Sequence, residues 1–346
     1  MPAGKVAVLG AGAWGTALAK VLAEKGDEVV VWARNADVVT QVNARHENER
    51  YLPGQKLPDC LWATSDLKES LSGATMVVFV APSHATREVA HLAAPFISNG
   101  TPIVSATKGI ENDSLMFMDE VLREELPKHV GDHLTFLSGP SFAKELANHL
   151  PTAVVIASKS PSTCEIVMRR FHSPYLRTYA SEDVIGVECG GALKNVIAIA
   201  AGACDGLGFG SNTRAALITR GLAEVARLSV ARGGSPLTLA GLAGMGDLVL
   251  TCTGELSRNR TVGLELGKGK KLADVLASLG HVAEGVKTTK SAYDLSQKLH
   301  VDMPITGEIY KVIYEDKPAE RAVVDLMARE LGPEFDMDVV RQAART

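Results

Sequence analysis

Short apolar runs alternate with helix-like segments along the first half of the chain. Residues 5–9 form the first run, and residues 16–25, which follow, have apolar side chains at helical spacing. Further strand-like runs cover residues 28–32, 76–80, 102–105, 134–137 and 153–156. These runs are nearly continuous in apolar residues, as in strands that are buried on both faces of a parallel sheet. The alternation of strand and helix predicts a doubly wound α/β sheet that is mostly parallel.

The pattern changes at about residue 183, after which strand-like runs stop. Helical patterns separated by glycines cover residues 187–204, 213–232, 283–299, 305–314 and 319–329. At about 150 residues per domain, a chain of 346 residues predicts about two domains. We therefore expect an α/β domain over residues 1–182 and an all-helical domain over residues 183–346.

Composition and charge exclude several classes of protein. The chain is 46% hydrophobic and 22% charged, with a formal net charge of −4, as in an ordinary soluble protein. It has no basic excess that would indicate nucleic acid binding. The five cysteines are far apart and form no C-x-x-C pair, and no H-E-x-x-H occurs, so we expect neither a disulfide framework nor a metal site. Reduced thiols are typical of the cytoplasm.

Export and membrane insertion are not expected. The apolar run near the N-terminus is short and ends in glycines, unlike an export signal. The most apolar internal run, residues 196–204, is too short for the about 20 residues that span a membrane. We expect it to be part of a buried helix.

Gly10, Gly12 and Gly15 form a G-x-G-x-x-G motif between a predicted strand and a predicted helix. A second predicted strand follows within about 30 residues, which is the context of a dinucleotide-binding turn. Gly10 would permit the tight turn, Gly12 would let the backbone approach a pyrophosphate, and Gly15 would let helix and strand pack closely. The motif predicts a Rossmann-type domain that binds NAD(H) or NADP(H); a glycine-rich turn without a ligand is the alternative.

Arg34 stands at the end of the second predicted strand. An acidic residue there would bind the ribose 2′-hydroxyl of NAD, whereas an arginine can accept the 2′-phosphate of NADP. The position favours NADP without excluding NAD. A solvated surface arginine is the alternative.

Two polar loops follow later strands of the first half. Residues 105–109 (S-A-T-K-G) and 138–143 (S-G-P-S-F-A) lie at carboxyl ends of predicted strands, where ligands of open α/β sheets gather. The second loop also opens a helix and can present backbone N–H groups. Each could equally be an ordinary strand-to-helix connection.

The second half carries three further clusters. Residues 186–195 combine small side chains with Lys194 and Asn195, just before a strongly apolar stretch. A lysine on a buried helix is costly without a partner or a task, unless its stem extends to solvent at a domain edge. Asp247 follows a Gly-Met-Gly turn, and residues 257–260 (S-R-N-R) place two guanidinium groups, an amide and a hydroxyl close together. Such a group can bind a phosphate, although a solvated polar loop is the alternative.

With these motifs the chain resembles the bacterial NAD(P)-dependent glycerol-3-phosphate dehydrogenases. The matching segments are GAGAWGTALA, VVFVAPS, SATKGIE, SGPSFAKE, ECGGALKNVIAIAAGACDGLGFGSNTRAALITRG, AGMGDLVLTCTGELSRNRTVG and HVAEGV. They run in order from residue 10 to about residue 286, and the segment around Lys194 is highly specific to this family. Ala13 stands where many relatives have Ser, which is tolerable because binding there runs through backbone N–H groups.

The resemblance implies roles for the matched positions and makes Lys194 the catalytic acid and base. Substrate contacts would be Lys108, Gly139, Ser141, Lys194, Asp247, Ser257, Arg258 and Asn259. Cofactor contacts would be Ala13, Trp14, Arg34, Lys108, Ala143, Arg258, Val282 and Glu284, besides Gly10, Gly12 and Gly15 of the turn. The family also implies a homodimer and a first committed step toward glycerophospholipids.

The implied reaction is reversible hydride transfer between nicotinamide C4 and C2 of dihydroxyacetone phosphate. Reduction leaves an alkoxide, to which Lys194 would donate a proton as an ammonium; the neutral amine would accept the proton in reverse. A free lysine has a pKa of about 10.4. Burial and a second cation such as Lys108 would favour the neutral amine, whereas Asp247 would oppose it if close.

Two alternative functions remain open on the sequence. One is another two-domain reductase, of the 2-hydroxyacid, ketopantoate or 6-phosphogluconate type, which would bind a carboxylate where we expect a phosphate near Arg258. The other is a dinucleotide sensor without activity. Lys194, Asp247 and residues 257–259 argue against a sensor, because sensing requires none of these groups.

Overall fold

The computed structural model describes residues 4–279, 284–334 and 336–344. Contacts within the chain divide it into two compact units. Unit 1 comprises Met1–Lys108 and Met118–Val184, and unit 2 comprises Gly109–Phe117 and Ile185–Thr346. The short segment Gly109–Phe117 thus packs with unit 2, although its neighbours in sequence belong to unit 1. The division into domains at residues 182 and 183 stays a prediction.

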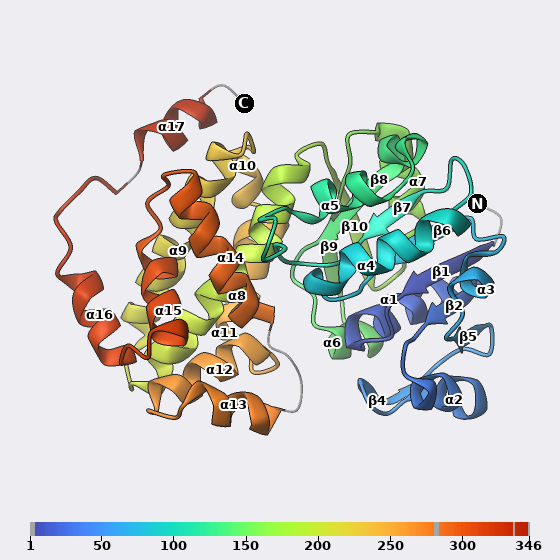
Figure 1. The fold of residues 1–346 in the computed structure, drawn as a ribbon, viewed down its shortest axis with the longest axis horizontal. Coiled ribbons are helices and arrows are strands. Elements are labelled where there is room, and N and C mark those ends of the chain that lie inside the picture. Colours follow the sequence, from blue (N-terminus) through green and yellow to red (C-terminus); the bar gives the residue numbers. More distant parts are fainter. Residues whose placement is uncertain (1–3, 280–283, 335, 345–346) are drawn as a thin grey trace. The chain divides into compact units, whose positions relative to one another are not determined.

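Unit 1 is built on an eight-stranded sheet in the order β10-β9-β8-β7-β6-β1-β2-β5 (Figure 1). Its strands are β1 (Lys5–Leu9), β2 (Glu28–Trp32), β5 (Leu61–Thr64), β6 (Met76–Phe79), β7 (Ile103–Ser105), β8 (Leu134–Ser138), β9 (Thr152–Ala157) and β10 (Leu176–Ser181). A separate antiparallel pair consists of β3 (Glu47–Asn48) and β4 (Leu52–Lys56). The strand order reverses between β1 and β6, and ligands of such sheets bind at the carboxyl ends beside this point.

The sheet is parallel except between β8 and β9. This confirms the prediction of a mostly parallel, doubly wound sheet, and each of the six apolar runs predicted as strands overlaps one. The sequence did not predict β5 or β10. In β10 exposed residues alternate with buried ones over most of its length, because the strand lies at the edge of the sheet and has no continuous apolar run.

The helices of unit 1 pack against the sheet, and their apolar side chains form the core of the unit together with those of the strands. They are α1 (Ala13–Glu24), α2 (Ala36–Arg45), α3 (Leu67–Leu71), α4 (Ser83–Ala93), α5 (Met118–Glu125), α6 (Ala143–Ala147) and α7 (Pro161–Phe171). Leu18 and Leu22 of α1 are fully buried in one cluster with Val6, Val8 and Val78 of the central strands. This packing fixes α1, and with it the glycine-rich turn, on the sheet.

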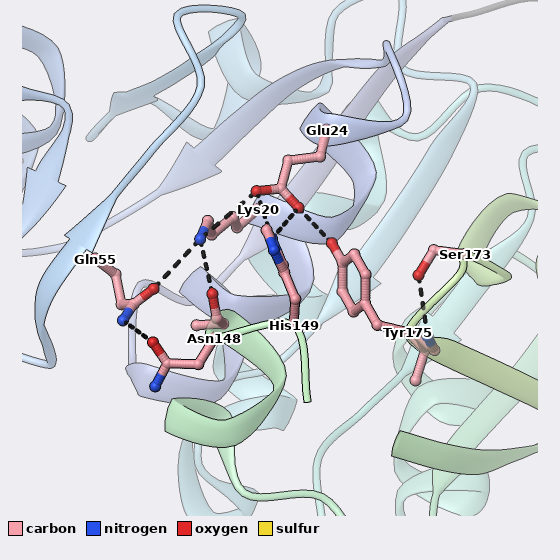
Figure 2. A network of polar contacts seen from close by, with 9 residues as sticks. Lys20, Glu24, Gln55, Asn148, His149, Ser173 and Tyr175 are labelled. Atoms are coloured by element: carbon pink, nitrogen blue, oxygen red, sulfur yellow. Dashed lines mark hydrogen bonds and ion pairs between the residues drawn. The ribbon is translucent and has the colours of Figure 1, made fainter. Parts of the chain in front are cut away.

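A polar network around Lys20 joins α1 to α6 (Figure 2). The Lys20 ammonium, 8% exposed, donates to the Ala147 carbonyl at 2.7 Å and lies 3.5 Å from Glu24 Oε1. Glu24 in turn contacts His149 Nε2 at 3.0 Å and accepts a hydrogen bond from the Tyr175 hydroxyl. A buried cation on the last carbonyl of a short helix satisfies a group that the helix leaves unpaired. The network therefore anchors α6, whose first residue, Ala143, is the last residue of the segment 138–143.

Unit 2 consists of helices (Figure 1). They are α8 (Val184–Gly206), α9 (Ser211–Ala231), α10 (Pro236–Leu239), α11 (Asp247–Thr253), α12 (Arg258–Gly267), α13 (Leu272–Leu279), α14 (Glu284–Lys298), α15 (Pro304–Tyr314), α16 (Ala319–Met327) and α17 (Met337–Ala343). A π-helical turn, Leu242–Gly246, directly precedes α11. No strand follows β10 in the part of the chain that the structure describes, in agreement with the change of pattern at about residue 183.

Helix α8 is the central element of unit 2. It is long and apolar enough to cross a membrane by length and composition alone, but 83% of its most apolar window is buried within the protein. It is therefore a buried core helix, as predicted for residues 196–204.

Helices α8 and α12 touch through their backbones. A Cβ at Gly263 of α12 would lie 1.9 Å from the Ile199 carbonyl oxygen, and one at Gly202 of α8 would lie 2.0 Å from the Arg260 carbonyl oxygen. Any larger side chain at either position would push the helices apart. This contact fixes the first turn of α12, which carries Arg258 and Asn259, relative to the α8 turn that carries Lys194.

Candidate functional site

The turn between β1 and α1 requires glycine at two positions. Gly10 has φ +135°, and a Cβ there would lie 2.9 Å from the Val80 carbonyl group. A Cβ at Gly15 would lie 2.0 Å from the Gly10 carbonyl oxygen. The turn is thus as tight as the motif predicts, and the strand and helix approach closely at Gly15.

The remaining residues of this turn fit a dinucleotide. Gly12 precedes α1, and nothing lies within 4 Å of the place where its Cβ would be. The amino end of α1 begins at Ala13 and has no acidic residue in its first turn, so its N–H groups can receive an anion. The Trp14 indole Nε1 is buried and has no hydrogen-bond partner among the described residues. A buried donor without a partner is costly, and a bound ligand would satisfy it.

Arg34 is exposed and lies beyond the end of β2. Its neighbour Asn35 caps α2 by accepting a hydrogen bond from the Asp37 N–H at 2.8 Å. The cap fixes the backbone at this position while the guanidinium remains accessible to solvent. That arrangement suits a residue that binds an anion at the end of the second strand.

The loops after β7 and β8 bring three predicted site residues together within unit 1. Lys108 Nζ donates to the Gly139 carbonyl oxygen at 3.1 Å, and Ser141 Oγ donates to the same oxygen at 2.9 Å. Ala143 is the first residue of α6 and is half-buried. An ammonium, a hydroxyl and the amino end of a helix therefore converge at the carboxyl edge of the sheet.

In unit 2 a close approach of two backbones brings Asp247 to Lys194. A Cβ at Gly190 of α8 would lie 2.3 Å from the Ala243 carbonyl oxygen in the π-helical turn. Asp247 follows that turn as the first residue of α11. One helical turn beyond Gly190, Lys194 Nζ donates to Asp247 Oδ1 at 2.5 Å. π-Helical turns occur frequently at functional sites, and here the turn aims the carboxylate.

The lysine–aspartate pair is buried: Lys194 is 9% exposed and Asp247 is 0% exposed. Thr251, one turn further along α11, donates from its hydroxyl to the Asp247 carbonyl oxygen at 2.6 Å. The same hydroxyl lies 3.4 Å from Asp247 Oδ1. In a buried place the nearby carboxylate stabilises the ammonium form of Lys194 and holds it in one position.

Cys252 is buried beside this pair, and burial raises the pKa of its thiol to about 12. The Lys194 ammonium opposes this rise, and the Asp247 carboxylate adds to it. The thiol therefore stays protonated at neutral pH and is not a nucleophile.

The first turn of α12 carries the predicted phosphate cluster. Ser257 caps the helix by accepting a hydrogen bond from the Arg260 N–H at 3.2 Å, and Arg258 is exposed. Asn259 Nδ2 donates to Asn195 Oδ1 at 2.9 Å. The turn thus combines the amino end of a helix, an exposed guanidinium and an amide that contacts the residue next to Lys194.

The second arginine of this cluster binds a buried carboxylate. Arg260 donates from Nε and Nη2 to Asp205 Oδ2 at 3.0 and 2.7 Å. Arg214 binds the other oxygen of the same buried carboxylate at 2.9 and 2.6 Å. Arg260 therefore fixes α12 to the end of α8.

Neither Asn195 nor Thr251 was among the predicted site residues, yet Asn195 accepts a hydrogen bond from Asn259, and Thr251 donates one to Asp247. Asn195 is next to Lys194 in the chain, and this position could have indicated that it belongs to the site. Thr251 lies four residues after Asp247, so the spacing of one helical turn could have indicated it. Glu284 begins α14, and Val282 lies outside the described residues.

The fold and the site together define a class of enzyme. A Rossmann-type sheet with a dinucleotide-binding turn, and a helical unit with a buried lysine–aspartate pair, are the features of a nicotinamide-dependent dehydrogenase. Two family models then match the chain: the N-terminal part of NAD-dependent glycerol-3-phosphate dehydrogenase over residues 5–164 and the C-terminal part over residues 183–324. The chain belongs to the NAD-dependent glycerol-3-phosphate dehydrogenase family.

Individual relatives agree with this assignment. A glycerol-3-phosphate dehydrogenase (NAD(P)+) of Geobacter sulfurreducens is 54% identical over 330 residues, which cover 95% of this chain and 98% of the relative. One from Myxococcus xanthus is 54% identical over 93% of this chain and 96% of its own. The crystal structure of glycerol-3-phosphate dehydrogenase from Coxiella burnetii matches with a TM-score of 0.90 and 44% identity, covering 94% of this chain and 99% of that chain.

Proposed function

We propose that Lys194 exchanges the proton in the reaction that this chain catalyses, the interconversion of sn-glycerol 3-phosphate and dihydroxyacetone phosphate with NAD(P). The activity rests on membership of the family and on relatives above 50% identity over nearly the whole chain. The role of Lys194 rests on one observation, the 2.5 Å contact of its buried ammonium with Asp247.

The cofactor, when bound, supplies or accepts the hydride. In the reductive direction the C2 carbonyl becomes an alkoxide, and the Lys194 ammonium donates a proton to that oxygen. Asp247 keeps the lysine charged before transfer and holds it in place; Thr251 in turn restrains Asp247. In the oxidative direction the neutral amine of Lys194 accepts the hydroxyl proton. The buried position excludes water, which would otherwise compete for the proton.

We assign phosphate binding to the first turn of α12. Arg258 is exposed there, Ser257 caps the helix, and the helix dipole favours an anion at this end. Asn259 and Asp247 complete the substrate contacts proposed for unit 2. Lys108, Gly139 and Ser141 are the substrate contacts proposed for unit 1.

We assign the pyrophosphate of the cofactor to the turn at Gly10, Gly12 and Gly15, with Ala13 and Trp14 at its helical side. Arg34 would bind a 2′-phosphate when NADP is the cofactor. Ala143 and Lys108 in unit 1, with Arg258, Val282 and Glu284 in unit 2, are the remaining cofactor contacts that the family resemblance suggests.

In the cell we propose that the chain works in the cytoplasm as a homodimer and supplies glycerol 3-phosphate for phospholipid synthesis. The five cysteines, all within the described residues, form no disulfide, and four of them are buried, which suits a reducing compartment. Light scattering after size exclusion would test the dimer, because a mass of one chain would contradict it.

A substrate comparison tests the proposed function. NADPH absorbance would be followed with dihydroxyacetone phosphate and, separately, with ketopantoate and pyruvate, which carry a carboxylate instead of a phosphate. We expect kcat/KM for dihydroxyacetone phosphate to exceed that for either acid by at least about a hundredfold. Equal or greater activity on a carboxylate substrate would contradict the proposal and favour a reductase of another class.

A further inference from the structure

The amide of Asn259 joins two helices of unit 2. Its Nδ2 donates to Asn195 Oδ1 of α8 at 2.9 Å, and its Oδ1 accepts from the Gly285 N–H of α14 at 3.0 Å. Asn195 directly follows Lys194, and Gly285 directly follows Glu284. One side chain thus connects the turn that carries the proposed proton donor with the first turn of α14.

The start of α14 is pressed against this amide. A Cβ at Gly285 would lie 2.6 Å from Asn259 Oδ1 and 2.9 Å from the Asn195 carbonyl oxygen, so glycine is needed there for a close approach. The same turn is held at a second point, because the Tyr314 hydroxyl of α15 donates to the Val286 carbonyl at 2.8 Å. Asn259 therefore contributes to a fixed position of the residue at which α14 begins.

We propose that Asn259 is a positioning residue for cofactor binding, acting through Gly285 on Glu284, in addition to its proposed contact with substrate. The inference rests on the proposed function, in which Glu284 contacts the cofactor. Removing the acceptor would leave the Gly285 N–H without its partner and release the first turn of α14. Cofactor affinity would then fall even when no substrate is present, which a contact with substrate alone does not predict.

Two substitutions at Asn259 separate these roles. Asn259→Ala removes both hydrogen bonds. Asn259→Asp keeps an oxygen that accepts from the Gly285 N–H, and the Asn195 amide can turn to donate to it, but the new carboxylate repels a phosphate. Gly285→Ala displaces the turn directly. Gly307→Ala in α15 is the matched control, because its Cβ would meet only Tyr293 Cε2 at an ordinary 3.8 Å.

The readout is the Kd of NADPH measured by fluorescence without substrate, beside KM for dihydroxyacetone phosphate and the thermal melting temperature. Loss of the hydrogen bond to the Gly285 N–H predicts that Asn259→Ala raises the Kd of NADPH about three- to tenfold, and the displaced turn in Gly285→Ala should raise it to a similar extent. Asn259→Asp should keep the Kd of NADPH within about twofold of the parent and raise KM for dihydroxyacetone phosphate, and Gly307→Ala should change neither.

An unchanged Kd of NADPH in both Asn259→Ala and Gly285→Ala would overturn the proposal and leave Asn259 as a substrate contact. The proposal would also fail if Asn259→Asp weakened NADPH as much as Asn259→Ala does. These outcomes differ from failure of the proposed function, in which the parent protein itself would not oxidise NADPH with dihydroxyacetone phosphate.

Discussion

Arg258 and Arg260 stand in the same helical turn but have different surroundings. The Arg258 side chain is exposed at the amino end of α12, whereas the Arg260 side chain is bound to the buried Asp205. The first is therefore available to a ligand and the second holds α12 against α8. A sequence of four polar residues cannot distinguish these roles, because the distinction depends on Asp205, which lies 55 residues away in the chain.

Arg258→Ala should weaken the use of dihydroxyacetone phosphate more than that of unphosphorylated dihydroxyacetone. A hydrogen bond to a charged group contributes about 1.5–3 kcal/mol, which corresponds to a ten- to hundredfold loss in kcat/KM. Steady-state kinetics on both substrates would measure the contrast. Arg260→Ala is the comparison: it leaves Asp205 with one partner fewer, so it should lower the melting temperature and affect both substrates alike. Equal losses on both substrates in Arg258→Ala would show that Arg258 does not bind the phosphate.

Arg34→Asp should raise KM for NADPH and leave KM for NADH unchanged or lower. A carboxylate at the end of β2 repels a 2′-phosphate, which the guanidinium attracts. Because Arg34 is exposed, the attraction should weaken at high salt. Kinetics with both cofactors at low and high salt would decide the matter. If both cofactors were impaired to the same extent, Arg34 would be a general adenosine contact or a structural residue.

At the scale of elements, the buried carboxylate of Glu224 caps a neighbouring helix. Glu224 lies in α9, and its oxygens accept hydrogen bonds from the Ile305 N–H at 2.5 Å and from the Thr306 N–H and hydroxyl at 3.1 and 3.0 Å. These donors form the amino end of α15. Burial raises the pKa of Glu224 to about 7, against these donors and Arg227, which lower it. Desolvation of the Glu224 charge therefore offsets part of the stability that the helix cap contributes.

This cap predicts a pH dependence of stability. The folded state binds a proton at Glu224 below about pH 7, whereas the unfolded chain does so only below its ordinary pKa of 4.5. Between these values the folded state holds more protons, so the contribution of Glu224 to stability falls as pH rises.

Denaturant unfolding of the parent and of Glu224→Gln, from about pH 5 to about pH 8, would measure the effect. The parent should lose about 3 kcal/mol relative to Glu224→Gln as pH rises through the full window from 4.5 to 7, because the variant cannot titrate at this position. If the free energy of unfolding changed with pH in the same way in both proteins, Glu224 would have the same protonation in the folded and the unfolded state, which would contradict this prediction.

Local sequence patterns predicted elements best where one strand or helix is buried throughout. The apolar runs of β1, β2 and β6 to β9 and the long helix α8 were predictable for this reason. The edge strand β10 was not, because buried and exposed side chains alternate over most of its length, and β5 was not, because it has only four residues. The link between α1 and α6 through Lys20 was also not predictable, since the Ala147 carbonyl is 127 residues away (Figure 2).

For the whole molecule, the sequence predicted the fold class and the change from an α/β part to a helical part. It did not predict which unit every segment belongs to. Gly109–Phe117 packs in unit 2 because the buried Ile110 and Phe117 join its apolar cluster, and the Ser291 hydroxyl donates to the Ile110 carbonyl at 3.3 Å. Sequence order alone places this segment in the first half. The predicted site residues Lys108, Gly139 and Ser141 came together as expected from strand ends, whereas the approach of Asp247 to Lys194 required the contact of Gly190 with Ala243.

The central claim, that Lys194 exchanges the proton of hydride transfer, is tested most directly by turnover of Lys194→Met beside Lys194→Met/Asp247→Asn. Lys194→Met leaves the buried Asp247 carboxylate without this ammonium and should destabilise the fold, and the second substitution should restore much of that stability. Both variants should still bind NADPH, and both should lose about 10²- to 10⁴-fold in kcat with dihydroxyacetone phosphate. A stable, NADPH-binding double variant whose kcat stays within about threefold of the parent would contradict the account.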